Sequence, residues 1–211
     1  RGVGIPNHVP PALSFRPRPD EQVAAAPERT EPAQSAPPAP EQLPFASLAG
    51  LGRLLRARTL SSAELTELYL ARLARHDPQL HCVITLTEDL AREQARRADA
   101  ELAAGRDRGP LHGIPWGAKD LLATRGIRTT SGAGPFREQV FDADATVVAR
   151  LADAGAVLAA KLTLGELAWG DVWYGEQTRN PWDLSEGSSG SSAGSASATA
   201  AGLVGFSIGS E

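Results

Sequence analysis

The chain has 211 residues, a formal net charge of −4 and a composition that is 42% hydrophobic and 22% charged, which is typical of a globular protein. The acidic balance argues against a general nucleic-acid binder, and no apolar run approaches the roughly 18 residues of a membrane span. The single cysteine, Cys82, excludes an intrachain disulfide framework and a multi-cysteine metal site. The chain contains no methionine, so we expect residue 1 not to be the native start. The compartment stays open, with a cytoplasmic location as the default expectation.

Proline dominates the first part of the chain. Eleven of the 16 prolines lie between Pro6 and Pro44, and this stretch has no sustained apolar period. Such a composition is typical of an extended or disordered spacer with some polyproline II character. We therefore predict an arm over residues 1–44 and a folded domain over residues 45–211.

Helical signals follow in order after the arm. Leucines at helical spacing predict a helix over 46–57, and Ser61-Ser-Ala-Glu64 has the pattern of a capping box that begins the next helix. We expect Pro78 to end that second helix. An alanine-rich amphipathic helix is predicted over 88–104, with Gly105 as its C-terminal stop.

Strand signals are interleaved with these helices. Short apolar runs predict strands at 82–86 and 156–160, and we expect Asp144 to cap a helix that runs to about residue 154. A small-residue helix over 195–201 is then followed by an apolar strand over 203–208. This alternation indicates an α/β architecture.

The segment Ser185–Gly202 consists almost entirely of glycine, serine and alanine. One interpretation is a flexible linker. Its second half, however, continues directly into a predicted helix and strand, which linkers rarely do. The alternative is a functional loop, in which glycines let backbone amides approach a reacting group and serines supply hydroxyls.

Lys119 ends the apolar run Gly113–Ala118, which we expect to be buried. Desolvation favours the neutral amine, so a lysine there is a candidate general base. The structural alternative is an ion pair with a nearby carboxylate, for which the neighbouring Asp120 is suited. A weaker alternative site is a serine–histidine pair through His112. The glycine-loop patterns that bind phosphate are missing from the sequence.

Four motifs in order carry a family resemblance. They are Gly-Ile-Pro-Trp-Gly-Ala-Lys-Asp at 113–120, Asn-Pro-Trp-Asp at 180–183, the glycine/serine segment, and Gly-Ser-Glu at 209–211. Over about residues 45–211 the chain resembles the amidase signature family. The resemblance implies an α/β amidase-signature fold, with a mixed β-sheet flanked by helices, that is incomplete in this chain.

The resemblance also implies site residues. Lys119 matches the lysine of a Ser–cis-Ser–Lys catalytic triad. Ser191, eight positions after Asp183, matches the middle serine, while Ser192 supports the lysine by hydrogen bonding and Gly190 precedes the cis peptide. Two positions depart from the usual Gly-Gly-Ser-Ser-Gly-Gly pattern, because Ser189 and Ala193 stand where the family has glycines.

The nucleophilic serine of the family would lie four positions beyond Glu211, so we expect this chain to be the N-terminal part of a longer, and only then active, domain. The implied function is hydrolysis of a small-molecule carboxamide through an acyl-enzyme, with no metal or organic cofactor. Alternatives are the glutaminase subunit of a tRNA-dependent amidotransferase and a non-catalytic protein that retains the fold. The proline-rich arm favours a stand-alone enzyme, and the oligomeric state stays open.

Overall fold

The computed structural model describes residue 39 and residues 41–211. Most of the predicted arm over 1–44 therefore lies outside the described residues, and the division at residue 44 stays a prediction. The final residues of that stretch enter a short 3-10 helix, Leu43–Phe45, in which Pro44 is buried.

A mixed four-stranded sheet forms the centre of the described part, with the strand order β1-β3-β2-β6. Strand β1 is antiparallel to β3, whereas β2 runs parallel to both β3 and β6. A separate two-stranded sheet pairs β4 with β5. The strands are β1 (Val83–Leu86), β2 (Pro115–Lys119), β3 (Val157–Leu162), β4 (Arg179–Asn180), β5 (Asp183–Gly187) and β6 (Phe206–Ile208).

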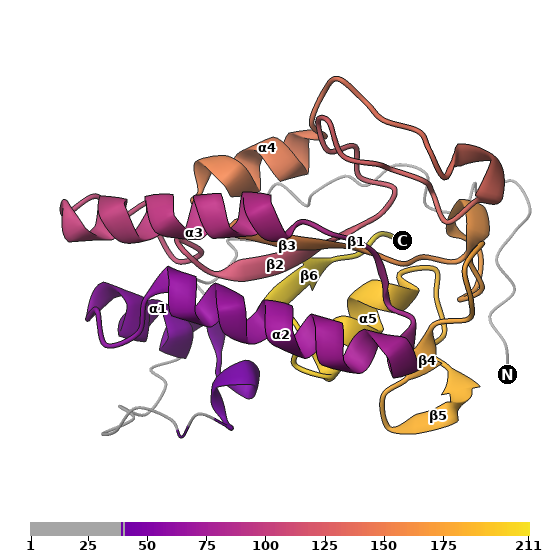
Figure 1. Ribbon diagram of the computed structural model, residues 1–211, viewed down its shortest axis with the longest axis horizontal. Coiled ribbons are helices and arrows are strands. Elements are labelled where there is room, and N and C mark those ends of the chain that lie inside the picture. The colour runs from indigo at the N-terminus through magenta and orange to yellow at the C-terminus, as the bar shows by residue number, and fades with distance from the viewer. Residues whose placement is uncertain (1–38, 40) are drawn as a thin grey trace, which may run out of the picture. The chain divides into compact units, whose positions relative to one another are not determined.

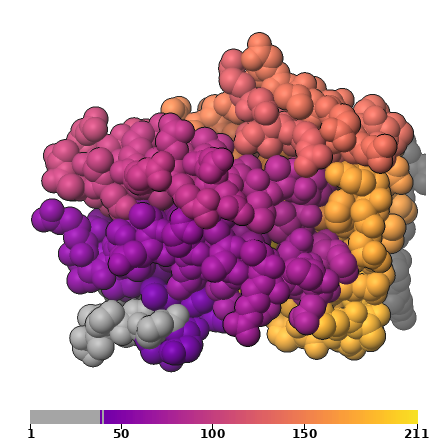
Figure 2. Space-filling view, viewed as in Figure 1, coloured from indigo at the N-terminus to yellow at the C-terminus, as the bar shows by residue number. Residues whose placement is uncertain are grey.

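Helices cover both faces of this sheet, which confirms the predicted α/β class (Figure 1). Helix α4 packs on the face that carries Trp116 and Leu158, whereas α2 and α5 pack on the face that carries Val157 and Leu162. Helices α2 and α3 lie side by side on the surface (Figure 2). The helices are α1 (Leu48–Arg56), α2 (Ser62–Leu80), α3 (Glu88–Ala103), α4 (Thr146–Asp153) and α5 (Ala193–Ala200), with 3-10 turns at Gly134–Phe136 and Glu166–Ala168.

The start of α2 follows the sequence prediction and its end does not. The Ser61 side chain accepts from the Glu64 amide, and the Glu64 carboxylate accepts in return from the Ser61 amide, so the predicted capping box is confirmed. Pro78 was expected to end the helix, but α2 continues to Leu80 and closes on His81 in the left-handed conformation. Proline is tolerated there because the last turn still forms the bond from the His81 amide to the Asp77 carbonyl.

The predicted cap of α4 is also wrong. Helix α4 begins at Thr146 after Ala145, and no side chain caps it. The carboxylate of Asp144 instead accepts a hydrogen bond of 2.7 Å from the Arg125 amide. A distant loop thus competes successfully for the capping group, which no local sequence signal reveals.

A register shift in the centre of the sheet determines which side chains share a face. Between β2 and β3 the pairing moves from Trp116 opposite Leu158 to Gly117 opposite Ala160, so one extra residue of β3 is accommodated. Because side chains alternate along a strand, this bulge reverses the facing of all later residues of β3. It places Leu162 on the same face as Lys119 and sends Lys161 to the other face.

Candidate active site

Lys119 lies at the carboxyl end of β2 and is fully buried, with 0% of its surface exposed. Its Nζ atom donates hydrogen bonds to three serine hydroxyls: Ser191 Oγ at 2.8 Å, Ser192 Oγ at 3.0 Å and Ser210 Oγ at 2.9 Å. Three donated hydrogen bonds use the three N–H bonds of the ammonium form, whereas the neutral amine donates to two of these hydroxyls and its lone pair accepts from the third. The structure therefore brings the predicted lysine and both predicted serines into one hydrogen-bonded cluster.

The sheet topology explains why Ser210 joins this cluster. Strand β6 is parallel to β2, and parallel neighbours end at the same edge of a sheet. Ser210 follows β6 by two residues and so arrives beside Lys119. Its amide also donates to Ser192 Oγ at 3.1 Å. This bond ties the segment after β6 to residues 188–192, which precede α5 and are termed the serine loop.

The serine loop reaches Lys119 from the start of α5. The peptide bond between Gly190 and Ser191 is cis, as the resemblance implies. Only glycine fits at position 190, because a Cβ atom there would lie 1.8 Å from the carbonyl oxygen of Gly170. The next turn is anchored by a 3.0 Å hydrogen bond from the Gly194 amide to the carbonyl oxygen of Thr163, the residue after β3.

The two departures from the family pattern are accommodated differently. Ser189 adopts a left-handed backbone conformation with φ of +64°, a region that glycine enters at the lowest cost. A hydrogen bond of 3.1 Å from its amide to the Asp171 carboxylate supports this conformation. Ala193 is fully buried as the first residue of α5, where a small residue suffices.

The surroundings of Lys119 favour the uncharged amine. Burial lowers the pKa of Lys119, and the carboxylate of Glu211 acts in the opposite direction. The neighbouring Asp120 does not pair with Lys119, as the structural alternative required, because its carboxylate lies 2.7 Å from the Nζ atom of Lys161. The geometry is thus that of a desolvated lysine among hydroxyls.

A pocket of about 560 Å³ opens beside the serine cluster. Its size suits a small-molecule substrate. Trp169 lines it with 86% of its surface exposed, and Ser191 and Ser210 are among its lining residues. The lining residues are Ala168, Trp169, Gly170, Asp171, Ser189, Gly190, Ser191, Ser210 and Glu211.

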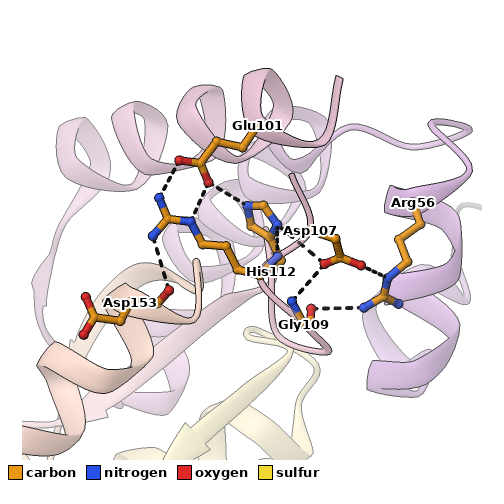
Figure 3. A network of polar contacts seen from close by, with 7 residues as sticks. Arg56, Glu101, Asp107, Gly109, His112 and Asp153 are labelled. Carbon is orange, nitrogen blue, oxygen red and sulfur yellow. Dashed lines mark hydrogen bonds and ion pairs between the residues drawn. The ribbon is translucent and has the colours of Figure 1, made fainter. Parts of the chain in front are cut away.

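His112 belongs to a different cluster, so the alternative serine–histidine site is wrong (Figure 3). Its Nε2 atom lies 3.2 Å from the Glu101 carboxylate, and its Nδ1 atom accepts a 3.1 Å hydrogen bond from the Arg108 amide. Arg108 also donates to both Glu101 oxygens and to the Asp153 carbonyl, while Arg56 binds Asp107 beside them. These contacts join α1, α3 and α4 to the loop that leads into β2.

This cluster predicts an acid-sensitive contribution to stability. Burial lowers the pKa of His112, although the Glu101 and Asp107 carboxylates act against that shift. The native state therefore holds the imidazole neutral, and its contribution is present above the ordinary imidazole pKa and is lost as the pH falls. In urea titrations between about pH 7 and pH 5, we expect His112→Asn to reduce the fall in unfolding free energy with acidification. An unchanged pH slope in that variant would contradict this assignment.

Three polar residues around the site were missed by the sequence analysis. Ser210 stands inside the Gly-Ser-Glu motif, and its place at the end of a strand parallel to β2 was the available signal. Lys161 and Asp171 carried no local signal, because a register shift and a folded-back loop bring them into place.

The site is thus a buried lysine hydrogen-bonded to serines at the carboxyl end of β2, in an α/β sheet. The family model described as Amidase matches residues 64–211. Curated glutamyl-tRNA(Gln) amidotransferase A subunits are similar. The subunit of a Roseiflexus species is 46% identical over 155 residues, which cover 72% of this chain and 32% of the relative. That of Pseudomonas fluorescens is 46% identical, and the alignment covers 75% and 33%.

Several solved structures of amidases are also similar to this chain. The native peptide amidase of Stenotrophomonas maltophilia is 40% identical with a TM-score of 0.71, covering 77% of this chain and 36% of that one. A peptide amidase in complex with the competitive inhibitor chymostatin is 41% identical with a TM-score of 0.74, covering 79% and 36%. A fatty acid amide hydrolase, 24% identical with a TM-score of 0.76 over 82% of this chain and 32% of its own, shares the fold.

The chain belongs to the amidase signature family. It spans about a third of the length of the curated relatives it matches. In the part that the structure describes, no helix is both long enough and apolar enough to cross a membrane.

Proposed function

We propose that this chain supplies the base and the proton relay of an amide hydrolase, with Lys119 as the base and Ser191 as the relay. The observation that supports these roles is the contact of a fully buried lysine amine with Ser191 Oγ at 2.8 Å. Ser192 holds the same amine from a second side, and Gly190 provides the close backbone approach that the loop requires.

The chemistry needs a nucleophile, which we propose is the serine expected four positions beyond Glu211. Its hydroxyl attacks the amide carbonyl while its proton passes to Ser191 Oγ, and the Ser191 proton passes to the neutral Lys119 Nζ. Collapse of the tetrahedral intermediate breaks the C–N bond, and the protonated relay returns a proton to the departing amine. Water then cleaves the acyl-enzyme by the same route and restores the neutral lysine.

A second candidate is the glutaminase subunit of a tRNA-dependent amidotransferase. The observation in its favour is the 46% identity to two curated A subunits, since the same triad would release ammonia from glutamine for a partner. The two proposals share their chemistry and differ in the substrate and in whether the ammonia is transferred.

The test uses the full-length protein, meaning this chain with its C-terminal continuation. Purified alone, it is incubated with C-terminal peptide amides, simple carboxamides and glutamine, and released ammonia is measured. We expect hydrolysis of peptide amides or simple carboxamides without any partner. Hydrolysis of glutamine alone would favour the amidotransferase subunit, and no hydrolysis of any amide would contradict both.

A further inference from the structure

The only two lysines of the chain are both fully buried. Of its 21 basic residues, all except Lys119 and Lys161 are arginines, and both lysines are 0% exposed. Arginine cannot lose its proton in a protein and presents a planar fork, whereas lysine is a compact cation whose charge depends on its surroundings. A buried lysine outside the serine cluster therefore requires its own explanation.

Lys161 is surrounded by acceptors on the opposite face of the sheet from Lys119. Its Nζ atom lies 2.7 Å from Asp120 Oδ1, and it donates to Thr129 Oγ1 at 2.9 Å and to the Arg128 carbonyl at 3.1 Å. The Asp120 contact is an ion pair whose angles fall outside those of a directed hydrogen bond. Three acceptors around one ammonium suit lysine and would not suit the fork of arginine.

The partner of Lys161 directly follows Lys119 in the chain. Asp120 is also 0% exposed, and its Oδ2 atom accepts hydrogen bonds from the Thr130 amide at 2.7 Å and the Thr130 hydroxyl at 2.6 Å. Asp120 directly follows β2, and its contact with Lys161, on the face opposite Lys119, directs this carboxylate away from the Lys119 amine. The bulge in β3 brings Lys161 to the face where it can meet Asp120.

Few other charges act on Lys119. The helix α5 and the strand β6, which pack beside it, contain no charged residue, and α2 turns apolar and hydroxyl side chains inward. Glu211 is the carboxylate that stabilises its ammonium form, and Asp171 lines the adjoining pocket. The charge of Asp120, the residue next to Lys119 in the chain, is held in its ion pair with Lys161.

We propose that Lys161 is a positioning residue of the active site. As the counter-ion of Asp120 it fixes that carboxylate on the far face of the sheet and cancels its charge, so that the Lys119 amine stays neutral and directed at the serines. This inference rests on the proposed function, because it assigns Lys119 the role of the base.

The experiment compares pH profiles of kcat/KM for a peptide amide in the full-length protein. In Lys161→Met the Asp120 charge loses its counter-ion, and we expect the acid limb to move to higher pH by on the order of one unit. In the double variant Lys161→Met/Asp120→Asn both charges are removed, and we expect the limb to return to its wild-type position. Asp120→Asn alone leaves the Lys161 charge without its counter-ion, so we expect the limb to move to lower pH in this variant.

A purely structural role predicts a different pattern, in which activity falls while the limb stays in place and the double variant restores nothing. An acid limb that stays in place in Lys161→Met, or a double variant that restores nothing, would overturn the proposal. A shift of the limb to higher pH in Asp120→Asn would also overturn it. If Lys161→Met does not fold, the pH profiles of the double variant and of Asp120→Asn are compared instead, because these two variants differ only in the Lys161 charge. The double variant leaves no unpaired buried charge, so we expect it to fold.

A readout independent of turnover separates this inference from the proposed function. The pH titration of the Lys119 Nζ signal is followed by ¹⁵N-lysine NMR and assigned by its loss in Lys119→Met. If the wild-type protein hydrolyses no amide, the proposed function is refuted. If the Lys119 titration in Lys161→Met is the same as in the wild type, only the role of Lys161 is refuted. The same holds if the Lys119 titration does not differ between the double variant and Asp120→Asn.

Discussion

Replacing Lys119 with methionine in the full-length protein is expected to lower kcat for amide hydrolysis by at least about 10⁴-fold. Methionine has a similar length and fills the buried space, but it offers no lone pair to accept the Ser191 proton. The near-ultraviolet circular dichroism should stay unchanged, since the site is desolvated and an apolar side chain is tolerated there. Turnover is measured by ammonia release.

Arg96→Met provides the control for loss of a cation. Arg96 lies exposed on α3, away from the serine cluster, and its replacement should leave the turnover at the wild-type level. A Lys119→Met variant that is folded and retains wild-type turnover would contradict the assignment of Lys119 as the base.

The second large effect is expected for Ser191→Ala, with a loss of kcat of about 10³-fold or more. The variant breaks the relay because the Lys119 amine loses the hydroxyl at 2.8 Å that connects it to the nucleophile. Ser192→Ala should cost less, on the order of 10- to 100-fold, because that hydroxyl orients the amine without carrying the proton. The measurement is again the steady-state release of ammonia.

The matched control is Ser188→Ala in the same loop. The hydroxyl of Ser188 donates to the backbone carbonyl of Ser189 at 3.1 Å and makes no contact with Lys119. Its turnover should stay within a factor of about three of the wild type, because Ser188 is a half-buried side chain whose hydroxyl contacts the backbone carbonyls of Ser189 and Ala193. Equal losses in the Ser188 and Ser191 variants would show that the loop tolerates no change and would refute a specific relay.

The sequence predicted helix ends correctly where residues close to one another in the chain determine them. The Ser61–Glu64 capping box begins α2, and Gly105 follows the end of α3 in the left-handed conformation. The two wrong predictions, at Pro78 and Asp144, concern end residues whose hydrogen-bond partners come from the last helical turn or from another segment of the chain. Such competition depends on the assembled fold, so the sequence pattern alone does not reveal it.

The site residues likewise fall into those that the sequence motifs identified and those that depend on the assembled fold. The order of four motifs was enough to name Lys119, Ser191, Ser192 and Gly190, and the structure brings all four together. The contribution of Ser210 depends on the parallel pairing of β6 with β2. The pairing of Asp120 with Lys161 depends on a one-residue bulge in β3 that no periodicity in the sequence indicates.

The most direct test of the central claim is the rate at which a fluorophosphonate labels the full-length protein, followed by intact mass and peptide mapping. We predict one label, on the serine four positions beyond Glu211. Its rate should rise with pH as Lys119 becomes neutral and should fall at least about 100-fold in Lys119→Met. Labelling of another residue, or an equal rate in Lys119→Met at every pH, would contradict the claim that Lys119 and Ser191 activate the nucleophile of an amide hydrolase.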